Sequence, residues 1–452
     1  MLAPRRVGAR NSVNREVIVS DTPDAASSRA PAATVRGEYQ SGRGASAKLD
    51  TKVDSFRPRR VRPVAPVMPV LPQGEVSAKI QRFLAERRPK TPCVIVDVDI
   101  VEANYRALTE AMPQQGRTYY AVKANPAREI LARLRDLGSC FDVASPGEIE
   151  LCLSVGIGGD RISYGNTIKK ERDIAFARSR GVRLFAADSI SELQKIARAA
   201  PGSDVFVRLL WQCGGAEWPL SRKFGCSPKM AGDLLVKARD LGLNPRGVSF
   251  HVGSQQTDLT QYDQAIAEVA RVFAVVEAEG ITLDLVNIGG GFPARYRTDV
   301  APIVAYGHVV EAALARHFPG RTMSLIMEPG RSMVGDAGVI AAEVVLISRK
   351  DDDDPVRWVY LDVGKFSGLA ETMDEAIKYR LRTPRDGGPT GPVVLAGPTC
   401  DSADILYEKF NYELPLDLAE GDQILLLSTG AYTTTYSSVA FNGFRPLKDY
   451  CI

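Results

Sequence analysis

A lysine at the end of an apolar run is the first residue in this sequence that could do chemistry. Lys123 lies in the run YYAVKAN (119–125), which has the composition of a buried strand. Apolar neighbours could desolvate its ammonium and lower its pKa, and a deprotonated amine attacks carbonyl carbon to form a Schiff base. On this run alone, a lysine that reaches solvent from a strand end is the simpler interpretation. The chemistry therefore needs support from other residues.

Three consecutive glycines mark a place where the backbone could close around a phosphate. Gly289, Gly290 and Gly291 lie in the stretch NIGGGFP, and the bare N–H groups of glycine can approach a phosphate closely. A plain tight turn explains the same residues equally well. Arg331, three residues after Glu328, would add a cation to such a site. The sequence contains neither a G-x-G-x-x-G fingerprint there nor a P-loop, so dinucleotide and P-loop sites lose support.

Further polar residues stand at the ends of other apolar runs. His251 is one of three histidines and is followed closely by Ser254. A hydrogen-bonded core histidine is the commoner situation when His251 is taken alone. Asp142 and Arg208 occur in two more apolar runs. If the runs are neighbouring strands of one sheet, these side chains would meet at one face. That convergence supports the functional interpretation.

The elements that would position these residues form a regular alternation. Apolar runs are followed by loops and then by segments with helical 3.6-residue periodicity. A parallel (β/α)8 barrel and a doubly wound open sheet both produce this pattern. The polar residues favour the barrel, because they end every run, whereas an open sheet concentrates them at one or two switch points. The eight runs are residues 119–125, 140–145, 161–166, 183–189, 205–210, 247–254, 283–291 and 324–330.

The chain divides into four parts by composition. Residues 1–72 are rich in Ala, Arg, Ser and Pro without periodicity, which predicts a disordered N-terminal extension rather than an organelle transit peptide. We expect residues 73–99 to join the β domain, although their run TPCVIVDVD could instead add a strand to the barrel. Residues 100–336 form the expected barrel. Residues 337–452 carry β-rich runs punctuated by Gly and Pro, which predicts a C-terminal antiparallel β domain.

Composition narrows the class of protein and its surroundings. The chain has 452 residues and a formal charge of +3 from 57 basic and 54 acidic side chains, without a dense basic run, so we expect a small-molecule substrate and no nucleic acid. Seven cysteines without C-x-x-C spacing argue against a disulfide framework or a zinc site and favour a reducing, cytoplasmic location. No apolar run is long enough for a membrane helix, so we expect no membrane partner.

Seven motifs in order resemble one enzyme family. They are AVKAN, FDVAS-x-x-E, HVGS, IGGGFP, EPGR, GPTCDS-x-D and GAYTTTYSSVAFNGF. The likeness runs from about residue 75 to the C-terminus and is to the alanine-racemase-fold decarboxylases of the ornithine decarboxylase type, which use pyridoxal 5′-phosphate. The fold it implies is a (β/α)8 TIM-like barrel that binds the cofactor, plus an alanine-racemase-like C-terminal β domain.

The resemblance also implies roles for the barrel residues. Lys123 would form the Schiff base with the cofactor, and Glu328 would pair with its pyridine nitrogen and keep the ring protonated. His251 would stack on the ring face, and Asp142 and Arg208 match cofactor-side polar residues. The phosphate would be held by Gly289, Gly290, Gly291, Ser254, Arg331 and Tyr432.

The resemblance further implies a homodimer whose active sites are shared between subunits. Cys400 and Asp401 match residues that this family lends across its dimer, with Cys400 as the proton donor to the α-carbon and Asp401 as the ligand of the distal ammonium. Phe441 would pack near the shared site. Phe366 stands where a tyrosine is common in the familiar eukaryotic pattern, and Glu371, Asp374 and Glu375 all remain candidates for the acid that grips the distal amine.

The expected reaction is decarboxylation of L-ornithine to putrescine and carbon dioxide, in polyamine biosynthesis. A dual lysine/ornithine decarboxylase is the main alternative, because pockets discriminate one methylene by only about 1–3 kcal/mol. A diaminopimelate-type decarboxylase is less favoured, since that group resembles a Cys-Glu rather than a Cys-Asp pair. A non-catalytic regulatory homologue would have lost Lys123 or Cys400, and both are present.

Overall fold

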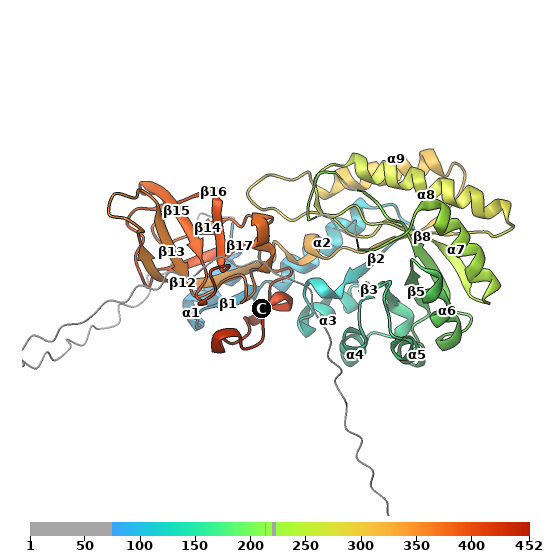
Figure 1. Cartoon of the computed structure of the whole chain (residues 1–452), viewed down its shortest axis with the longest axis horizontal. Coiled ribbons are helices and arrows are strands. Elements are labelled where there is room, and N and C mark those ends of the chain that lie inside the picture. The colour runs from blue at the N-terminus through green and yellow to red at the C-terminus, as the bar shows by residue number, and fades with distance from the viewer. Residues whose placement is uncertain (1–74, 213, 219–222) are drawn as a thin grey trace, which may run out of the picture. The chain divides into compact units, whose positions relative to one another are not determined.

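The structure is a computed structural model, and it describes residues 75–212, 214–218 and 223–452. The expectation of a disordered extension over residues 1–72 therefore lies outside the described residues. Within the described part, Figure 1 shows a barrel surrounded by helices. It also shows a separate set of strands from the C-terminal part of the chain, coloured orange.

Eight parallel strands close into a barrel in the order β10-β11-β2-β3-β4-β5-β6-β8. Each of the eight predicted runs overlaps one of these strands, so the predicted barrel is confirmed. Most runs extend past the strand into the following loop, where the polar residues lie. The strands are β2 (Gly116–Ala121), β3 (Cys140–Val143), β4 (Ile162–Tyr164), β5 (Leu184–Ala187), β6 (Asp204–Arg208), β8 (Asn244–Ser249), β10 (Leu285–Asn287) and β11 (Ser324–Met327).

Amphipathic helices cover the outside of the barrel (Figure 1). In the longest of them, apolar residues spaced three or four apart are buried against the strands, among them Tyr262, Ile266, Val269 and Phe273. Local capping sets where several helices begin: the Ser145 hydroxyl accepts the N–H of Glu148 at 3.3 Å. The helices are α2 (Val98–Ala111), α3 (Arg128–Asp136), α4 (Pro146–Ser154), α5 (Glu171–Ser179), α6 (Ile190–Ala199), α7 (Pro228–Asp240), α8 (Thr260–Ala278), α9 (Ile303–His317) and α10 (Arg331–Val334).

A second, mostly antiparallel sheet follows the barrel. Its main path runs β14-β17-β12-β13-β15-β16, and β1 pairs with β12 and β18. The pairs β13–β15 and β1–β18 are parallel and the other pairs are antiparallel. The strands are β1 (Cys93–Val96), β12 (Gly338–Ser348), β13 (Arg357–Leu361), β14 (Leu381–Arg382), β15 (Thr390–Ala396), β16 (Ile405–Pro415), β17 (Gln423–Leu427) and β18 (Lys448–Cys451). A small antiparallel pair, β7 (Ala216–Trp218) with β9 (Ser254–Gln256), stands apart from both sheets.

The run 91–99 adds no strand to the barrel, so that alternative is wrong. Its strand β1 pairs with β12 instead, and the preceding helix α1 (Ala78–Arg87) packs on the same sheet. Ile80 and Leu84 of α1, one helical turn apart, are buried with Val339 and Leu425. The N-terminal part of the described chain is thereby folded into the sheet of the second domain.

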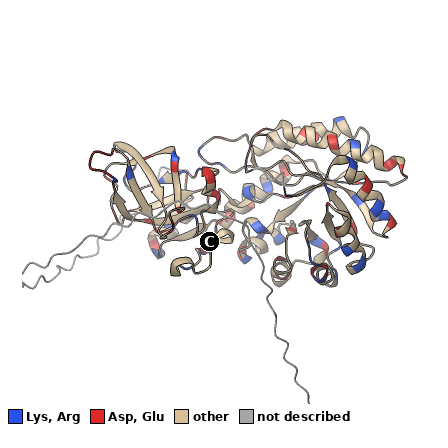
Figure 2. Cartoon of the chain, in the orientation of Figure 1, with Lys and Arg blue, Asp and Glu red and all other residues tan. Residues whose placement is uncertain are grey.

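Charged side chains are spread evenly over the described helices. In the view of Figure 2, basic and acidic residues alternate along the helices that surround the barrel. No helix in the described part combines the length and the apolar composition that crossing a membrane requires.

Candidate active site

The carboxyl ends of the barrel strands bring the predicted residues to one face. Lys123 lies in η1 (Val122–Ala124), one turn of 3₁₀ helix that follows β2 directly. The strands on either side of β2 are β3, which carries Asp142, and β11, after which Glu328 follows. The Ala121 N–H donates to the Pro329 carbonyl at 3.0 Å, which ties the ends of β2 and β11 together. The lysine therefore stands between two carboxylates.

The pKa of Lys123 is shifted in the direction opposite to the one expected from the sequence. Its Nζ lies 3.9 Å from Oδ2 of Asp142. Burial lowers the pKa of the ammonium, but Asp142, Tyr432 and Glu328 together outweigh burial and raise it above its ordinary value. The lysine side chain is still 51% exposed, so its amine is accessible from the mouth of the barrel. Apolar neighbours alone could not predict this result, because the carboxylates come from other strands.

Asp142 and Glu328 sit in different surroundings. Burial, and then the charge of Glu328, raise the pKa of Asp142 well above its ordinary value, while Lys123 and Arg208 oppose the shift. Oδ1 of Asp142 is buried and has no hydrogen-bond partner among the described residues. Glu328 is half-buried, and its Oε1 accepts a hydrogen bond from Nδ2 of Asn287 at 2.6 Å. Asn287 is a residue that the sequence analysis did not single out, although it lies in the motif that carries the glycines.

His251 is held as a neutral ring. Burial, followed by the charges of Arg208 and Lys123, keeps its pKa well below the usual range. Its Nδ1 accepts the N–H of Gly253 at 3.0 Å, which leaves the ring proton on Nε2. Arg208 ends β6, and its guanidinium lies 5.0 Å from the ring centre of Phe224. A neutral, oriented imidazole can present its face to a flat ligand.

The glycine loop after β10 exposes backbone donors. Gly289 and Gly291 have φ values of +64° and +94°, which favour glycine. The loop also passes close to neighbouring backbone, since a Cβ on Gly290 would lie 2.5 Å from the carbonyl oxygen of Glu328. Among the described residues, no hydrogen bond uses the N–H groups of Gly290 and Gly291. These two donors are available to an anion.

Arg331 is buried and lies beside Ser254, as the predicted phosphate site requires. Its Nε and Nη2 donate to Oγ of Ser254 at 3.2 and 3.1 Å. It also binds two residues that the sequence analysis did not place here, Tyr296 and Glu371. Tyr296 has no distinguishing sequence signal, whereas Glu371 lies in the segment in which the acids could not be assigned.

Tyr432 reaches the site from the second domain. The loop after β17 is fixed to the lysine turn by two hydrogen bonds: the Tyr432 N–H donates to the Ala124 carbonyl at 2.8 Å, and Nδ2 of Asn125 donates to the Gly430 carbonyl at 2.9 Å. Burial raises the pKa of Tyr432, so its hydroxyl keeps the proton that a phosphate oxygen could accept. The phenol ring also lies 4.9 Å from the Arg331 guanidinium.

The remaining predicted residues form a separate group. Cys400 and Asp401 are exposed in the loop between β15 and β16. The Cys400 N–H donates to Oδ1 of Asn442 at 3.0 Å, and Phe366 and Phe441 have ring centres 4.9 Å apart. In the described part of the chain, no hydrogen bond or ion pair joins this group to Lys123. Within the described residues, this group and the lysine cluster therefore share no polar contact.

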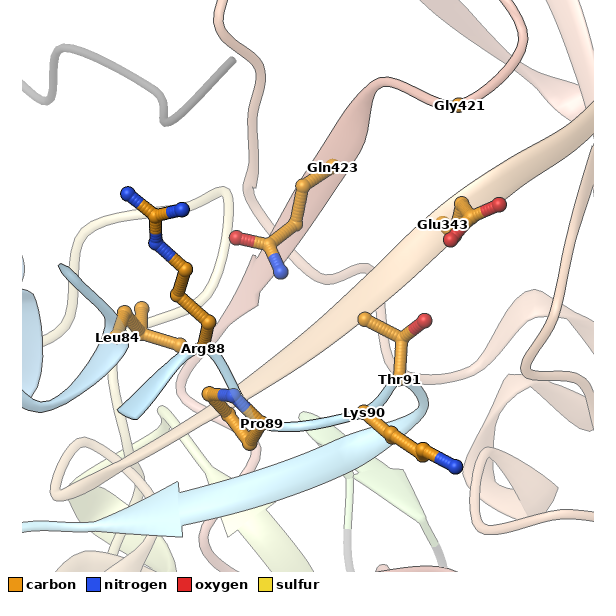
Figure 3. A pocket seen from close by; sticks show the side chains of 8 residues that line it. All are labelled: Leu84, Arg88, Pro89, Lys90, Thr91, Glu343, Gly421 and Gln423. Carbon is orange, nitrogen blue, oxygen red and sulfur yellow. The ribbon is translucent and has the colours of Figure 1, made fainter. Parts of the chain in front are cut away.

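A further cavity, of about 280 Å³, lies beside the end of α1 (Figure 3). It is formed by the end of α1, the segment that leads into β1, and strands β12 and β17. Its lining includes Arg88, Lys90 and Gln423 and none of the predicted site residues.

Comparison with known proteins gives a consistent assignment. Residues 98–335 match the family model described as the pyridoxal binding domain of pyridoxal-dependent decarboxylases. The chain is 36% identical over 370 residues to the lysine/ornithine decarboxylase of Selenomonas ruminantium, which covers 82% of this chain and 91% of that protein. It is 33% identical over 369 residues to the ornithine decarboxylase of Mus musculus, with 78% of each chain covered.

Solved structures extend the likeness to three dimensions. The lysine/ornithine decarboxylase of Vibrio vulnificus has been solved with putrescine and with cadaverine. Both structures superpose with a TM-score of 0.74, at 31% and 32% identity, over 83% of this chain and 99% of that chain.

The chain belongs to the family of pyridoxal-dependent decarboxylases that act on basic amino acids. It is accordingly a carboxy-lyase with the alanine-racemase-like fold, and its cofactor is pyridoxal 5′-phosphate. The site fits this cofactor in three ways: an accessible lysine between carboxylates, a buried Asp142 oxygen without a protein partner, and free N–H groups in the glycine loop.

Proposed function

We propose that this protein decarboxylates L-ornithine to putrescine and carbon dioxide, as a homodimer that serves polyamine synthesis in the cytoplasm. The observation that carries the proposal is the exposed Cys400-Asp401 pair, which combines a thiol with one carboxylate outside the lysine cluster. A carboxylate beside the thiol suits a substrate whose distal group is an ammonium. The free thiols among the described cysteines agree with a reducing compartment.

In this proposal the barrel residues hold the cofactor's ring. Lys123 would form the covalent link, and Glu328, oriented by Asn287, would pair with the pyridine nitrogen. His251 covers one face of the ring as a neutral imidazole, and Asp142 and Arg208 supply polar contacts at its edge. When bound, the cofactor would supply a sink for the electron pair left on the α-carbon when carbon dioxide departs.

A second set of residues would hold the phosphate. The N–H groups of the glycine loop and the hydroxyls of Ser254 and Tyr432 donate hydrogen bonds to it, and Arg331 supplies positive charge. The raised pKa of Tyr432 supports its role as a donor.

A second copy of the chain completes the site in this proposal. Cys400 donates a proton to the α-carbon, and Asp401 binds the distal ammonium of the substrate held by the other subunit. An exposed apolar surface lies beside this pair in the segment after Tyr432: Val439 is 83% exposed, and Tyr436, Phe441 and Phe444 are also exposed. Apolar groups gathered in this way are typical of an interface.

The segment 361–379 leaves one acid available to the substrate. Glu371 is paired with Arg331, and Glu375 accepts the N–H groups of Glu408, Lys409 and Phe410 at 2.8, 2.6 and 2.7 Å. Asp374 is exposed, and its carboxylate makes no hydrogen bond or ion pair with the described residues. We therefore propose Asp374 as the acid of this segment that meets the distal ammonium.

Lysine is the second candidate substrate. It is favoured by the likeness to relatives whose names include both lysine and ornithine, and by Phe366, whose ring lacks the hydroxyl of a tyrosine and leaves the pocket less polar. The two amino acids differ by one methylene, which a pocket distinguishes by only about 1–3 kcal/mol.

The test is release of carbon dioxide by the cofactor-loaded protein from L-ornithine, L-lysine, L-arginine and meso-diaminopimelate, compared by kcat/KM. We expect the highest value with ornithine. Comparable values with lysine would replace the proposal by a dual decarboxylase. Release from none of them by a cofactor-loaded protein would contradict both and favour a non-catalytic homologue.

A further inference from the structure

Glu371 belongs to the second domain, but it accepts hydrogen bonds from Arg331, a barrel residue of the proposed phosphate site. Its Oε1 accepts Nη2 of Arg331 at 2.6 Å and its Oε2 accepts Nη1 at 2.7 Å, a bidentate pair. Only 3% of the arginine side chain and 4% of the glutamate side chain are exposed. Removing water from two charges is costly, so such a pair is retained only where its geometry is useful or well compensated.

The pair leaves Arg331 with every donor engaged by the protein. Nη1 donates to Glu371 and to the hydroxyl of Tyr296 at 2.7 Å. Nη2 donates to Glu371 and to Ser254, and Nε donates to Ser254. A guanidinium has five N–H groups, and all five have acceptors here. Any N–H that Arg331 gives to a phosphate must first be withdrawn from one of them.

The consequence falls on Ser254. Its Oγ accepts two N–H groups from Arg331, so the hydroxyl proton must point away from the guanidinium. The serine adjoins the glycine loop: the Gly291 carbonyl accepts the Gln256 N–H at 2.9 Å, and a Cβ on Gly291 would lie 2.5 Å from the Gly253 carbonyl oxygen. The serine proton is therefore available beside the free N–H groups of Gly290 and Gly291.

We propose that Glu371 is a positioning residue for the cofactor's phosphate. It fixes Arg331, and Arg331 in turn orients the Ser254 hydroxyl and the Tyr432 ring at the glycine loop. Glu371 thereby makes phosphate recognition depend on the second domain, and it is not the acid that binds the distal ammonium. This inference rests on the phosphate site described under the proposed function.

A purely electrostatic role would have the opposite sign. Glu371 neutralises Arg331, so removing its charge would leave an uncompensated cation near the phosphate and tighten binding. Positioning predicts weaker binding, because the freed guanidinium turns towards other acceptors and releases Ser254. The sign of the change therefore separates the two roles.

The test compares pyridoxal 5′-phosphate with pyridoxal, which lacks the phosphate. The dissociation constant of each is measured on the full-length protein by quenching of its tryptophan fluorescence. With Glu371→Gln, we expect the affinity for the phosphorylated compound to fall about tenfold or more relative to pyridoxal. Glu371→Asp, which keeps the charge, should restore part of the loss.

Glu375→Gln is the matched control, because it removes an acid four residues away that only caps the N–H groups of β16. A general disturbance of the segment weakens the binding of both ligands alike. It leaves unchanged the ratio of the dissociation constant of pyridoxal to that of pyridoxal 5′-phosphate. We expect Glu375→Gln to behave in that way.

Coupling to Ser254 is measured with a double variant. If Glu371 acts through Ser254, Ser254→Ala should lower the ratio by itself, and adding Glu371→Gln should lower it little further. Should Glu371→Gln fail to fold, Glu371→Asp takes its place, because it keeps the charge but shortens the side chain. Its ratio should still be lower than that of the wild type.

An unchanged or increased ratio in Glu371→Gln, or fully additive effects with Ser254→Ala, would overturn the inference. A raised KM for the amino acid with an unchanged ratio would assign Glu371 to the distal ammonium instead. The binding measurements contain no substrate, so they stand or fall independently of whether ornithine is decarboxylated.

Discussion

Asp362 shows how burial tunes a single side chain outside the active site. It follows β13, and its Oδ1 accepts the Glu343 N–H at 2.8 Å. Burial raises its pKa to about 6, against the opposing hydrogen bonds from Thr91 and from the Glu343 backbone. The folded protein therefore favours the protonated acid, whereas the unfolded chain ionises it near the ordinary value.

Replacing Asp362 by Asn should stabilise the protein in a defined pH range. Because the folded pKa is raised, the wild type loses stability as the pH rises from about 4 to about 6, while the neutral amide does not. We expect Asp362→Asn to raise the free energy of unfolding by about 2 kcal/mol at pH 8. The gain should disappear at pH 4, as measured by denaturant unfolding. An equal gain at both pH values would show that ionisation is not the cause.

At the scale of single residues, the sequence predicts which residues lie at the site better than it predicts the charges around each of them. Lys123, Glu328 and His251 could be placed because motif and strand end coincide. The raised pKa of Lys123 could not be predicted, because Asp142 and Tyr432 approach it from distant parts of the chain. Glu371 could not be assigned for the same reason: its partner Arg331 is 40 residues away.

The loop after β17 connects the two domains at the site. Gly430 packs so closely that a Cβ there would lie 1.9 Å from the carbonyl oxygen of Val334. The same loop carries Tyr432, whose N–H bonds the turn that contains Lys123. The loop therefore carries both a close contact with the barrel domain and Tyr432, one of the residues proposed to bind the cofactor.

Gly430→Ala should displace the loop. We expect a loss of about 1–3 kcal/mol in the free energy of unfolding, typical of overpacking, together with weaker binding of pyridoxal 5′-phosphate because Tyr432 moves. Gly147→Ala, in helix α4 with its nearest atom at 3.8 Å, is the control. It should not lower the stability, because alanine is the better helix former, and it should leave the cofactor affinity unchanged. Unfolding curves and cofactor titration measure the two effects. Unaltered cofactor affinity in a destabilised Gly430→Ala would show that the loop does not position Tyr432.

At the scale of elements, the local sequence pattern predicts the strands and helices of the barrel. The eight barrel strands are short apolar runs between amphipathic helices, a pattern with few alternatives. Strand β16 was not predicted, because ILYEKFNYELP mixes charged and aromatic residues without a clean apolar face. The partner of β1 could not be read from its own four apolar residues, since pairing with β12 joins segments that are far apart in sequence.

At the scale of the whole molecule, the central claim is that two chains build each active site. Among the described residues, Lys123 contacts Asp142 and Cys400 contacts Asn442, and no hydrogen bond or ion pair joins the two groups. If each site takes its lysine from one subunit and its thiol from the other, two different inactive variants can repair each other.

The most direct test mixes the variants Lys123→Ala and Cys400→Ala as heterodimers and measures amine product. Each variant alone should form little product, and an equal mixture should recover about a quarter of wild-type activity, because half the dimers then contain one intact site. The control mixture of Lys123→Ala with Glu328→Ala should recover none, since both changes disable the barrel side. Absence of recovery in heterodimers of the first pair, or recovery in the control, would contradict a shared site.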